Sequence, residues 1–180
     1  MALTSTIYNF DIDLADADRG VYESLALRVA RHPSESEDFL LTRVLAYALE
    51  LEPGIDFSAG LCVPDEPALW VRDATGALRA WIEVGAPDAA RLHRAAKASP
   101  RVVVYNHKDV TQWLGRLLGE RIHRAAEIEL WAMDRGLLRE MASRLERRTA
   151  FGLSVADREL FVSIGDNTTL HGRLARHALV

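Results

Sequence analysis

Six consecutive residues, 101–106, limit the folds that are open to this chain. They read Arg-Val-Val-Val-Tyr-Asn, so a strand built from them would be apolar on both faces. Such a strand is typical of the interior of a parallel sheet, where helices cover both sides. Parallel neighbours need long crossover connections, which are usually helices. The run therefore predicts a central parallel strand in a mixed α/β fold.

Hydrophobic periodicity predicts the elements that precede this strand. Apolar and polar residues alternate over 8–14, which is the pattern of a strand with one face in water. Asp16 or Asp18 is then expected to cap a helix. The apolar stripe of that helix consists of Val21, Tyr22, Leu25 and Val29. The dipeptide His32-Pro33 ends it.

A second helix is expected to begin at Ser34, which forms a capping box with Glu37. Its buried positions are Leu40, Leu41, Val44, Leu45, Ala48 and Leu49. Three strands are expected next, over residues 56–63, 68–72 and 77–84. Asp73-Ala-Thr-Gly76 makes a hairpin turn between the last two strands. Asp88 caps a further helix that reaches Ala98.

Beyond the central strand, an apolar stripe predicts a helix that is closed by Gly119. The stripe consists of Val110, Trp113, Leu114, Leu117 and Leu118. Residues 127–133 are expected to form a strand, and Asp134 caps the helix that follows. The tail from residue 148 alternates in the manner of antiparallel strands joined by short turns.

The chain shows no repeats, low-complexity segments or linkers, so we expect a single domain over 1–180. Its core spans 34–106, and 1–15 and 148–175 form accessory antiparallel strands. Hydrophobic residues make up 49% and charged residues 27%, which excludes disordered and fibrous classes. The apolar runs are too short to cross a membrane, and the first residues lack the basic start of a secretion signal. The only cysteine, Cys62, cannot form an internal disulfide. We therefore expect a cytoplasmic protein.

Charge is unevenly spread along the chain. Residues 1–90 hold 6 Lys and Arg against 16 Asp and Glu, whereas residues 91–148 hold 13 against 7. The overall charge of −4 argues against a non-specific coat for nucleic acid, which is normally basic. The split still allows an acidic site beside a basic flank. The alternative is that these charges belong to solvated helix faces.

Two carboxylates stand out as candidates for chemistry, since no common phosphate loop, nucleophile elbow or zinc helix occurs. The expected hairpin register places Asp65 within one or two positions of Glu83 across adjacent strands. Paired carboxylates repel each other unless a proton or a cation lies between them. Oxygen ligands of this kind suit Mg²⁺ or Mn²⁺. In the alternative interpretation Asp65 caps a turn, and Glu66 and Glu83 are solvated.

A series of short motifs runs along nearly the whole chain. They are Met1-Ala-Leu3, Thr6-Ile-Tyr8, Ala30-Arg-His-Pro-Ser-Glu35, Arg43-Val-Leu-Ala46, Gly60-Leu-Cys62, Asp65-Glu-Pro67 with Trp70, Trp81-Ile-Glu83 with Gly85, Pro87-Asp88 with Arg91, and Tyr105-Asn106. In this order they resemble the bacterial YaeQ family, which looks like a variant of the PD-(D/E)XK nuclease superfamily. The core of that superfamily is a helix, a three-stranded meander, a helix and a strand. Periodicity predicts the same order over 34–106.

The resemblance implies a nuclease-like mixed sheet flanked by helices, with an added antiparallel ribbon formed by the N-terminal and C-terminal strands. It also implies site residues. The acids of the superfamily fall on Asp65, with Glu66 as a rival, on Glu83, and on Glu35 in the preceding helix. These acids would hold Mg²⁺ or Mn²⁺, which activates water for phosphodiester cleavage.

The superfamily's lysine, two residues after the second acid, is replaced by Gly85. Arg91 or Arg43 could take over its electrostatic role, although arginine does not act as a base. The leading hypothesis is a metal-dependent nuclease-like protein that acts on DNA or RNA, with Glu35, Asp65, Glu83 and Arg91 at its catalytic site. The alternative is a non-catalytic regulatory module on the same fold that binds nucleic acid or a protein partner. A third interpretation is a purely structural module.

Overall fold

The computed structural model describes residues 4–59 and 63–179, so Cys62 and the motif Gly60-Leu-Cys62 lie outside the described residues. The chain divides into two compact units. Unit 1 contains residues up to Leu41 together with Asp134–Leu174, and unit 2 contains Thr42–Met133 and the residues from Ala175 onward. Neither unit is a continuous piece of sequence.

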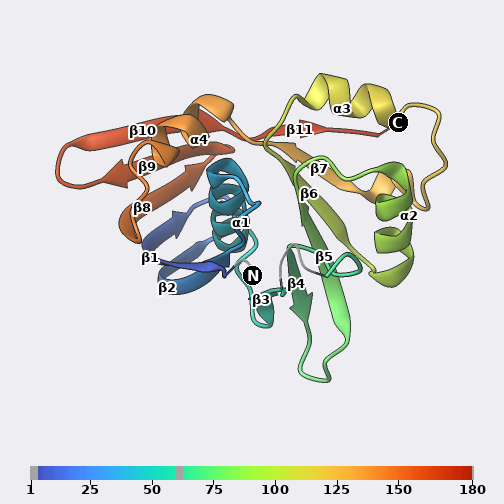
Figure 1. The fold of residues 1–180 in the computed structure, drawn as a ribbon, viewed down its shortest axis with the longest axis horizontal. Helices are drawn as coiled ribbons and strands as arrows, with labels where there is room; N and C mark the ends of the chain where they lie inside the picture. The colour runs from blue at the N-terminus through green and yellow to red at the C-terminus, as the bar shows by residue number, and fades with distance from the viewer. Residues whose placement is uncertain (1–3, 60–62, 180) are drawn as a thin grey trace. The chain divides into compact units, whose positions relative to one another are not determined.

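Unit 1 is built on a five-stranded sheet with the order β10-β9-β8-β1-β2 (Figure 1). Its strands are β1 (Thr6–Asp16), β2 (Val21–Arg31), β8 (Arg148–Ala156), β9 (Glu159–Ile164) and β10 (Thr168–Arg173). The N-terminal and C-terminal strands do combine, as expected. The ribbon is not purely antiparallel, however, because β1 and β8 pair in parallel. Helix α4 (Arg135–Ala142) packs against β10.

The helix predicted after Asp16 or Asp18 is wrong, since residues 21–31 form strand β2 along the full length of β1. Residues 17–20 make the connecting turn, where Gly20 has a φ of 67°. Asp16 and Asp18 cap turns instead of a helix. The Asp16 carboxylate accepts a hydrogen bond from the backbone of Arg19, and the Asp18 carboxylate accepts from the backbone of Arg158.

Unit 2 is built on a six-stranded sheet with the order β11-β7-β6-β5-β4-β3 (Figure 1). Its strands are β3 (Ile55–Phe57), β4 (Leu69–Arg72), β5 (Leu78–Val84), β6 (Val102–Asn106), β7 (Glu129–Ala132) and β11 (Ala175–His177). Strand β6 is buried throughout and runs parallel to both β5 and β7. The prediction of a central parallel strand is therefore confirmed.

Helices α2 (Ala89–Ala98) and α3 (Val110–Leu117) cover one face of this sheet. The core beneath them consists of Trp81, Leu92, Ala95, Ala96, Val102, Val104, Trp113, Leu117, Ile128 and Leu130. Asp88 caps α2 and Asp134 caps α4, as predicted. Leu118 was expected in the buried stripe but is 82% exposed, because α3 ends one residue earlier. Strand β7 begins at Glu129, later than the strand predicted over 127–133, because residues Ala125–Glu127 form a 3-10 helix.

Helix α1 (Glu37–Leu49) begins in unit 1 and continues into unit 2. Its six predicted buried positions are all buried. The predicted capping box at Ser34 is wrong. Ser36 caps the helix by accepting a hydrogen bond from the backbone of Phe39, whereas the Ser34 hydroxyl contacts the His32 ring.

The β3–β4–β5 meander follows α1 and precedes α2 and β6. The element order expected over 34–106 is therefore present. Gly76 turns the hairpin with a φ of 83°, and Trp70 faces Trp81, within two positions of the expected register. Strand β3 ends at Phe57, so residues 58–59 of the predicted strand over 56–63 do not belong to it, and its residues 60–62 lie outside the described residues. Within residues 4–59 and 63–179, none of the helices combines the length and apolar composition that a bilayer crossing needs.

Candidate functional site

Glu83 lies near the end of β5 and is only 3% exposed. Side chains alternate along a strand, so Glu83 lies on the same face as Trp81, which is the face that α2 covers. The Trp81 Nε1–H donates to Glu83 Oε1 at 2.6 Å, and Arg91 Nε donates to the same oxygen at 2.8 Å. Glu83 is thus a buried carboxylate held by two donors.

Arg91 connects Glu83 to the segment before β4. Its Nη2 donates to the carbonyl of Glu66 at 2.6 Å, and its Nη1 donates to the carbonyl of Pro64. Asp88 fixes the position of Arg91, because its carboxylate accepts the Arg91 backbone N–H at 2.8 Å in the first turn of α2. The guanidinium is therefore a cation that lies between Glu83 and the segment that carries Asp65.

Burial raises the pKa of Glu83 above its ordinary value of 4.5, because desolvation penalises the charged form. The Arg91 charge and the hydrogen bonds from Trp81 and Arg91 act in the opposite direction but do not cancel the effect of burial. The expectation that Arg91 takes over the electrostatic role of the superfamily's lysine stays a prediction.

Each of the other predicted acids has its own surroundings. Asp65 is exposed and precedes the first residue of β4, Leu69, so strand register does not place it opposite Glu83. The Glu66 carboxylate accepts from the backbone of Ala59 at 3.3 Å. Glu35 belongs to unit 1, where its carboxylate accepts from the backbone of His32 at 3.1 Å.

The expected binding of Mg²⁺ or Mn²⁺ stays a prediction. No group of three or more His, Cys, Asp or Glu side chains suited to a metal occurs among the described residues. The Glu83 oxygen that faces α2 already accepts two hydrogen bonds. The residue in place of the lysine, Gly85, has a φ of 98° and donates its N–H to the carbonyl of Tyr105 at 2.9 Å.

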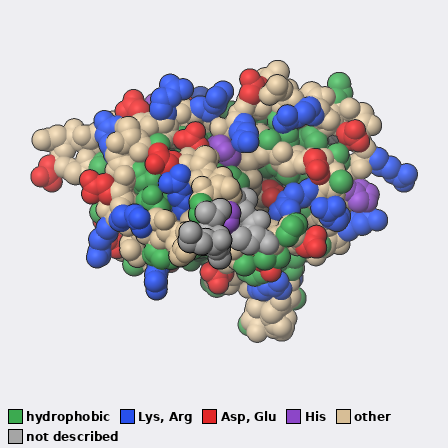
Figure 2. Space-filling view, viewed as in Figure 1, with side chains coloured by type: hydrophobic (Ala, Val, Ile, Leu, Met, Phe, Trp, Pro, Cys, Tyr) green, Lys and Arg blue, Asp and Glu red, His purple; other side chains and the backbone are tan. Residues whose placement is uncertain are grey.

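A basic surface lies over α2, α3 and the segments on either side of α3. Residues 89–124 hold eight Lys and Arg against two Asp and Glu, and three of the six histidines. The exposed cations of this surface are Arg94, Lys97, Lys108, Arg116 and Arg121. Figure 2 shows Lys and Arg side chains gathered with histidine over α2, on the right of the view. We call this group the α2 basic surface.

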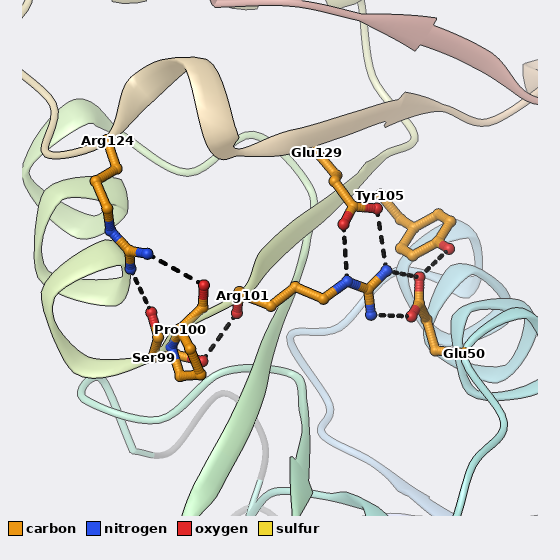
Figure 3. A network of polar contacts seen from close by, with 7 residues as sticks. All are labelled: Glu50, Ser99, Pro100, Arg101, Tyr105, Arg124 and Glu129. Carbon is orange, nitrogen blue, oxygen red and sulfur yellow. Dashed lines mark hydrogen bonds and ion pairs between the residues drawn. The ribbon is translucent and has the colours of Figure 1, made fainter.

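Sequence reasoning missed a second polar network in unit 2 (Figure 3). Arg101 donates to Glu50 at 2.6 Å and to Glu129 at 2.7 Å, and the Tyr105 hydroxyl donates to Glu50 at 2.7 Å. Burial lowers the pKa of Arg101, but the bonds to Glu129 and Glu50 outweigh it and raise that pKa above the usual range. Burial and the Glu50 charge raise the pKa of Tyr105 well above 10.0.

This network lies on the other face of the sheet from Glu83. Strand register pairs Glu83 with Val104, so Tyr105 points to the opposite side. The partners of Arg101 are 51 and 28 residues away in the sequence, and no local pattern links them. The network ties the end of α1 to β6 and β7 and leaves Glu83 on the α2 side.

The fold defines a class of mixed α/β protein with two units. In one of them, helices cover one face of a partly parallel sheet. The model of the YaeQ family, described as "YaeQ protein", matches residues 1–171, and the chain belongs to that family. The "Uncharacterized protein YaeQ" of Escherichia coli (strain K12) is 29% identical over 169 residues, 93% of each chain. The protein of the same description from Salmonella typhi is 30% identical over the same share.

Two crystal structures of YaeQ proteins share the fold. The protein from Pseudomonas syringae superposes with a TM-score of 0.85 at 31% identity, covering 96% of this chain and 95% of that one. The protein from Xanthomonas axonopodis pv. citri gives a TM-score of 0.86 at 28% identity, covering 97% and 99%. The family resemblance that the sequence motifs indicate is confirmed.

Proposed function

We propose that this protein is a non-catalytic nucleic-acid-binding module on a fold related to PD-(D/E)XK nucleases. The observation that carries this proposal is the ion pair between Arg91 and Glu83. A guanidinium that bonds to Glu83 and to two backbone carbonyls stands where a metal-dependent nuclease of this fold would need an open carboxylate.

The α2 basic surface supports the choice of nucleic acid as the partner. Exposed Lys and Arg side chains at i and i+3, such as Arg94 and Lys97, lie on the same side of a helix. Cations arranged in this way neutralise phosphates and release counterions.

Fluorescence anisotropy with labelled single- and double-stranded DNA and RNA, across a salt series, tests this proposal. Arg94→Gln combined with Lys97→Gln should weaken binding and flatten the slope of log K against log salt by about one for each phosphate contact removed. Arg28→Gln combined with Arg139→Gln removes two exposed cations from unit 1 and is the matched control. An affinity that does not change with salt concentration in any variant would contradict the proposal and favour a protein partner.

A metal-dependent nuclease is the second candidate, favoured by one contact. Arg91 touches both Glu83 and the backbone of the segment that carries Asp65 and Glu66, so the predicted acids come from neighbouring stretches of chain. Cleavage of the same nucleic acids in Mg²⁺ and Mn²⁺, with Glu83→Gln as the control for contamination, distinguishes the two. Cleavage that disappears in Glu83→Gln would establish the nuclease, whereas binding without cleavage supports the module.

A further inference from the structure

The segment 119–124, which follows α3, is fixed to α2 at two points. The backbone N–H of His123 donates to His93 Nδ1 at 3.2 Å, and the two rings meet edge to face with centroids 6.2 Å apart. Arg124 donates to the carbonyls of Ser99 at 2.6 Å and Pro100 at 3.2 Å beyond the end of α2 (Figure 3). Its φ of 49° is unusual for a residue other than glycine, so these contacts hold a strained backbone.

Only one of these two attachments depends on pH. His93 Nδ1 can accept a hydrogen bond only while it carries no proton, because both nitrogens of a charged imidazole are donors. Protonation of His93 at that nitrogen therefore breaks its bond with the His123 N–H. Arg124 stays charged at every pH of interest and keeps its contacts with the carbonyls. A proton thus loosens the segment at His93 without releasing it.

The surroundings of the pair are mainly basic. The charged residues of the elements around it are Arg91, Arg94 and Lys97 on α2, Arg116 on α3, Glu120, Arg121 and Arg124 in the segment, and Glu127, which already pairs with Arg124 at 3.2 Å. A phosphate bound beside the rings would supply the opposite charge and favour their protonated form.

We propose that His93 and His123 make phosphate binding by the α2 basic surface depend on pH, so that the protein binds nucleic acid more tightly as pH falls. This inference rests on the proposed function and adds its regulation. Imidazoles change charge between about pH 5 and pH 8, which places the response in a physiological range. Proton uptake and phosphate binding favour each other because coupling between two sites is reciprocal.

The test compares affinity at about pH 8 and about pH 5.5, where histidine charge differs most. The wild type should bind at least about fivefold more tightly at the lower pH, the lower end of typical coupling. Its salt slope should steepen by about 0.9 for each ring that neutralises a phosphate. The variant His93→Asn with His123→Asn should show neither change. Asparagine at position 93 offers an acceptor oxygen to the His123 backbone but does not titrate.

His171→Asn is the matched control, because His171 is an exposed histidine of unit 1 that contacts Glu159. It should keep the pH dependence of the wild type. Affinity that is the same at both pH values in the wild type, or a pH response that survives in the double variant, would overturn the inference and leave the proposed function standing. Absence of binding at both pH values would overturn the proposed function itself.

Hydrogen exchange of the His123 amide in the free protein tests the switch without nucleic acid. After correction for the intrinsic rate, the amide should be protected at the higher pH and lose protection at the lower one. In the single variant His93→Asn it should be protected at both. Equal protection at both pH values in the wild type would show that protonation does not break the contact, and would overturn the inference independently of any ligand.

Discussion

Arg91 Nε lies 2.8 Å from Glu83 Oε1 and joins the first turn of α2 to a buried position of β5. The carboxylate side chain is 4% exposed and the guanidinium side chain 25% exposed, so water reaches the arginine more readily than the glutamate. The other two nitrogens of the guanidinium each donate to a backbone carbonyl. Arg91 therefore links α2, β5 and the segment before β4. We expect its removal to lower the stability of the protein.

Arg91→Ala should lower the free energy of unfolding by about 3 kcal/mol near pH 8, since breaking a buried ion pair costs about 3–5 kcal/mol. The loss should shrink toward pH 5. Burial raises the pKa of Glu83, and removing Arg91 raises it further, so the neutral acid forms more readily in the folded variant. A group whose pKa is higher in the folded state than in the unfolded state stabilises the protein at pH values below the unfolded-state pKa. This stabilisation is lost as the pH rises through the folded-state pKa.

Urea unfolding of both proteins at several pH values measures this difference. The same Arg91→Ala change made together with Glu83→Gln is the control, because glutamine keeps an acceptor for Trp81 but carries no charge to titrate. In that background the cost of removing Arg91 should not vary with pH. A cost that is equal at about pH 5 and about pH 8 in the original background would contradict the role given to Glu83.

Arg101→Lys should destabilise unit 2 even though the charge is kept. Lysine cannot reach Glu50 and Glu129 together as the planar guanidinium does, and one charged hydrogen bond is worth about 1.5–3 kcal/mol. The Arg101 side chain is 37% exposed, so we expect the loss of stability to lie at the lower end of this range, about 1.5 kcal/mol. Arg116→Lys, an exposed position of α3, should stay within about 0.5 kcal/mol of the wild type. Equal stability of the two variants would contradict this prediction.

Gly172→Ala should lower stability by about 1–3 kcal/mol through overpacking. A methyl group at Gly172 would lie 2.8 Å from the Cβ atoms of Asp134 and Leu137, where α4 packs on β10. Gly115 lies in α3 with nothing within 4 Å of the same added atom. Gly115→Ala should therefore stabilise by up to about 1 kcal/mol, because alanine favours the helix. Thermal unfolding of both variants should give shifts of opposite sign.

Gly85→Lys would restore the lysine of the nuclease motif in sequence only. The φ of 98° at Gly85 is one that residues with a side chain rarely adopt, and such strain costs about 1–3 kcal/mol. Gly85→Ala should show the same loss of stability in urea unfolding without adding a charge. If both variants are as stable as the wild type, the backbone at this position is not the obstacle to a lysine.

Local signals were sufficient to predict several elements. The apolar run in β6 indicates its burial on both faces, and the Asp residues before α2 and α4 indicate their caps. The segment 21–31 shows how periodicity can mislead. Val21, Leu25 and Val29 are four residues apart, which suits one face of a helix and also one face of a strand. The hairpin with β1 decides between them, because β1 offers a full row of backbone partners.

The candidate site was less predictable for a physical reason. The hairpin turn correctly places β4 opposite β5, but register holds only where the strand continues, and β4 begins at Leu69. Asp65 therefore leaves the sheet before it can face Glu83. The Arg101 network depends on three elements that meet only after folding. Distances between such residues follow from tertiary packing and not from spacing along the chain.

The last strand, β11, belongs to the six-stranded sheet, whereas the strand before it in the chain, β10, belongs to the five-stranded sheet. The chain leaves β10 at Arg173 and, after Leu174, adds β11 antiparallel to β7 at the edge of the six-stranded sheet. Trimming residues 175–180 would uncover the N–H and C=O groups of β7 on that side. Open edges of this kind recruit strands from other molecules. Variants shortened at this end should therefore be prone to aggregation.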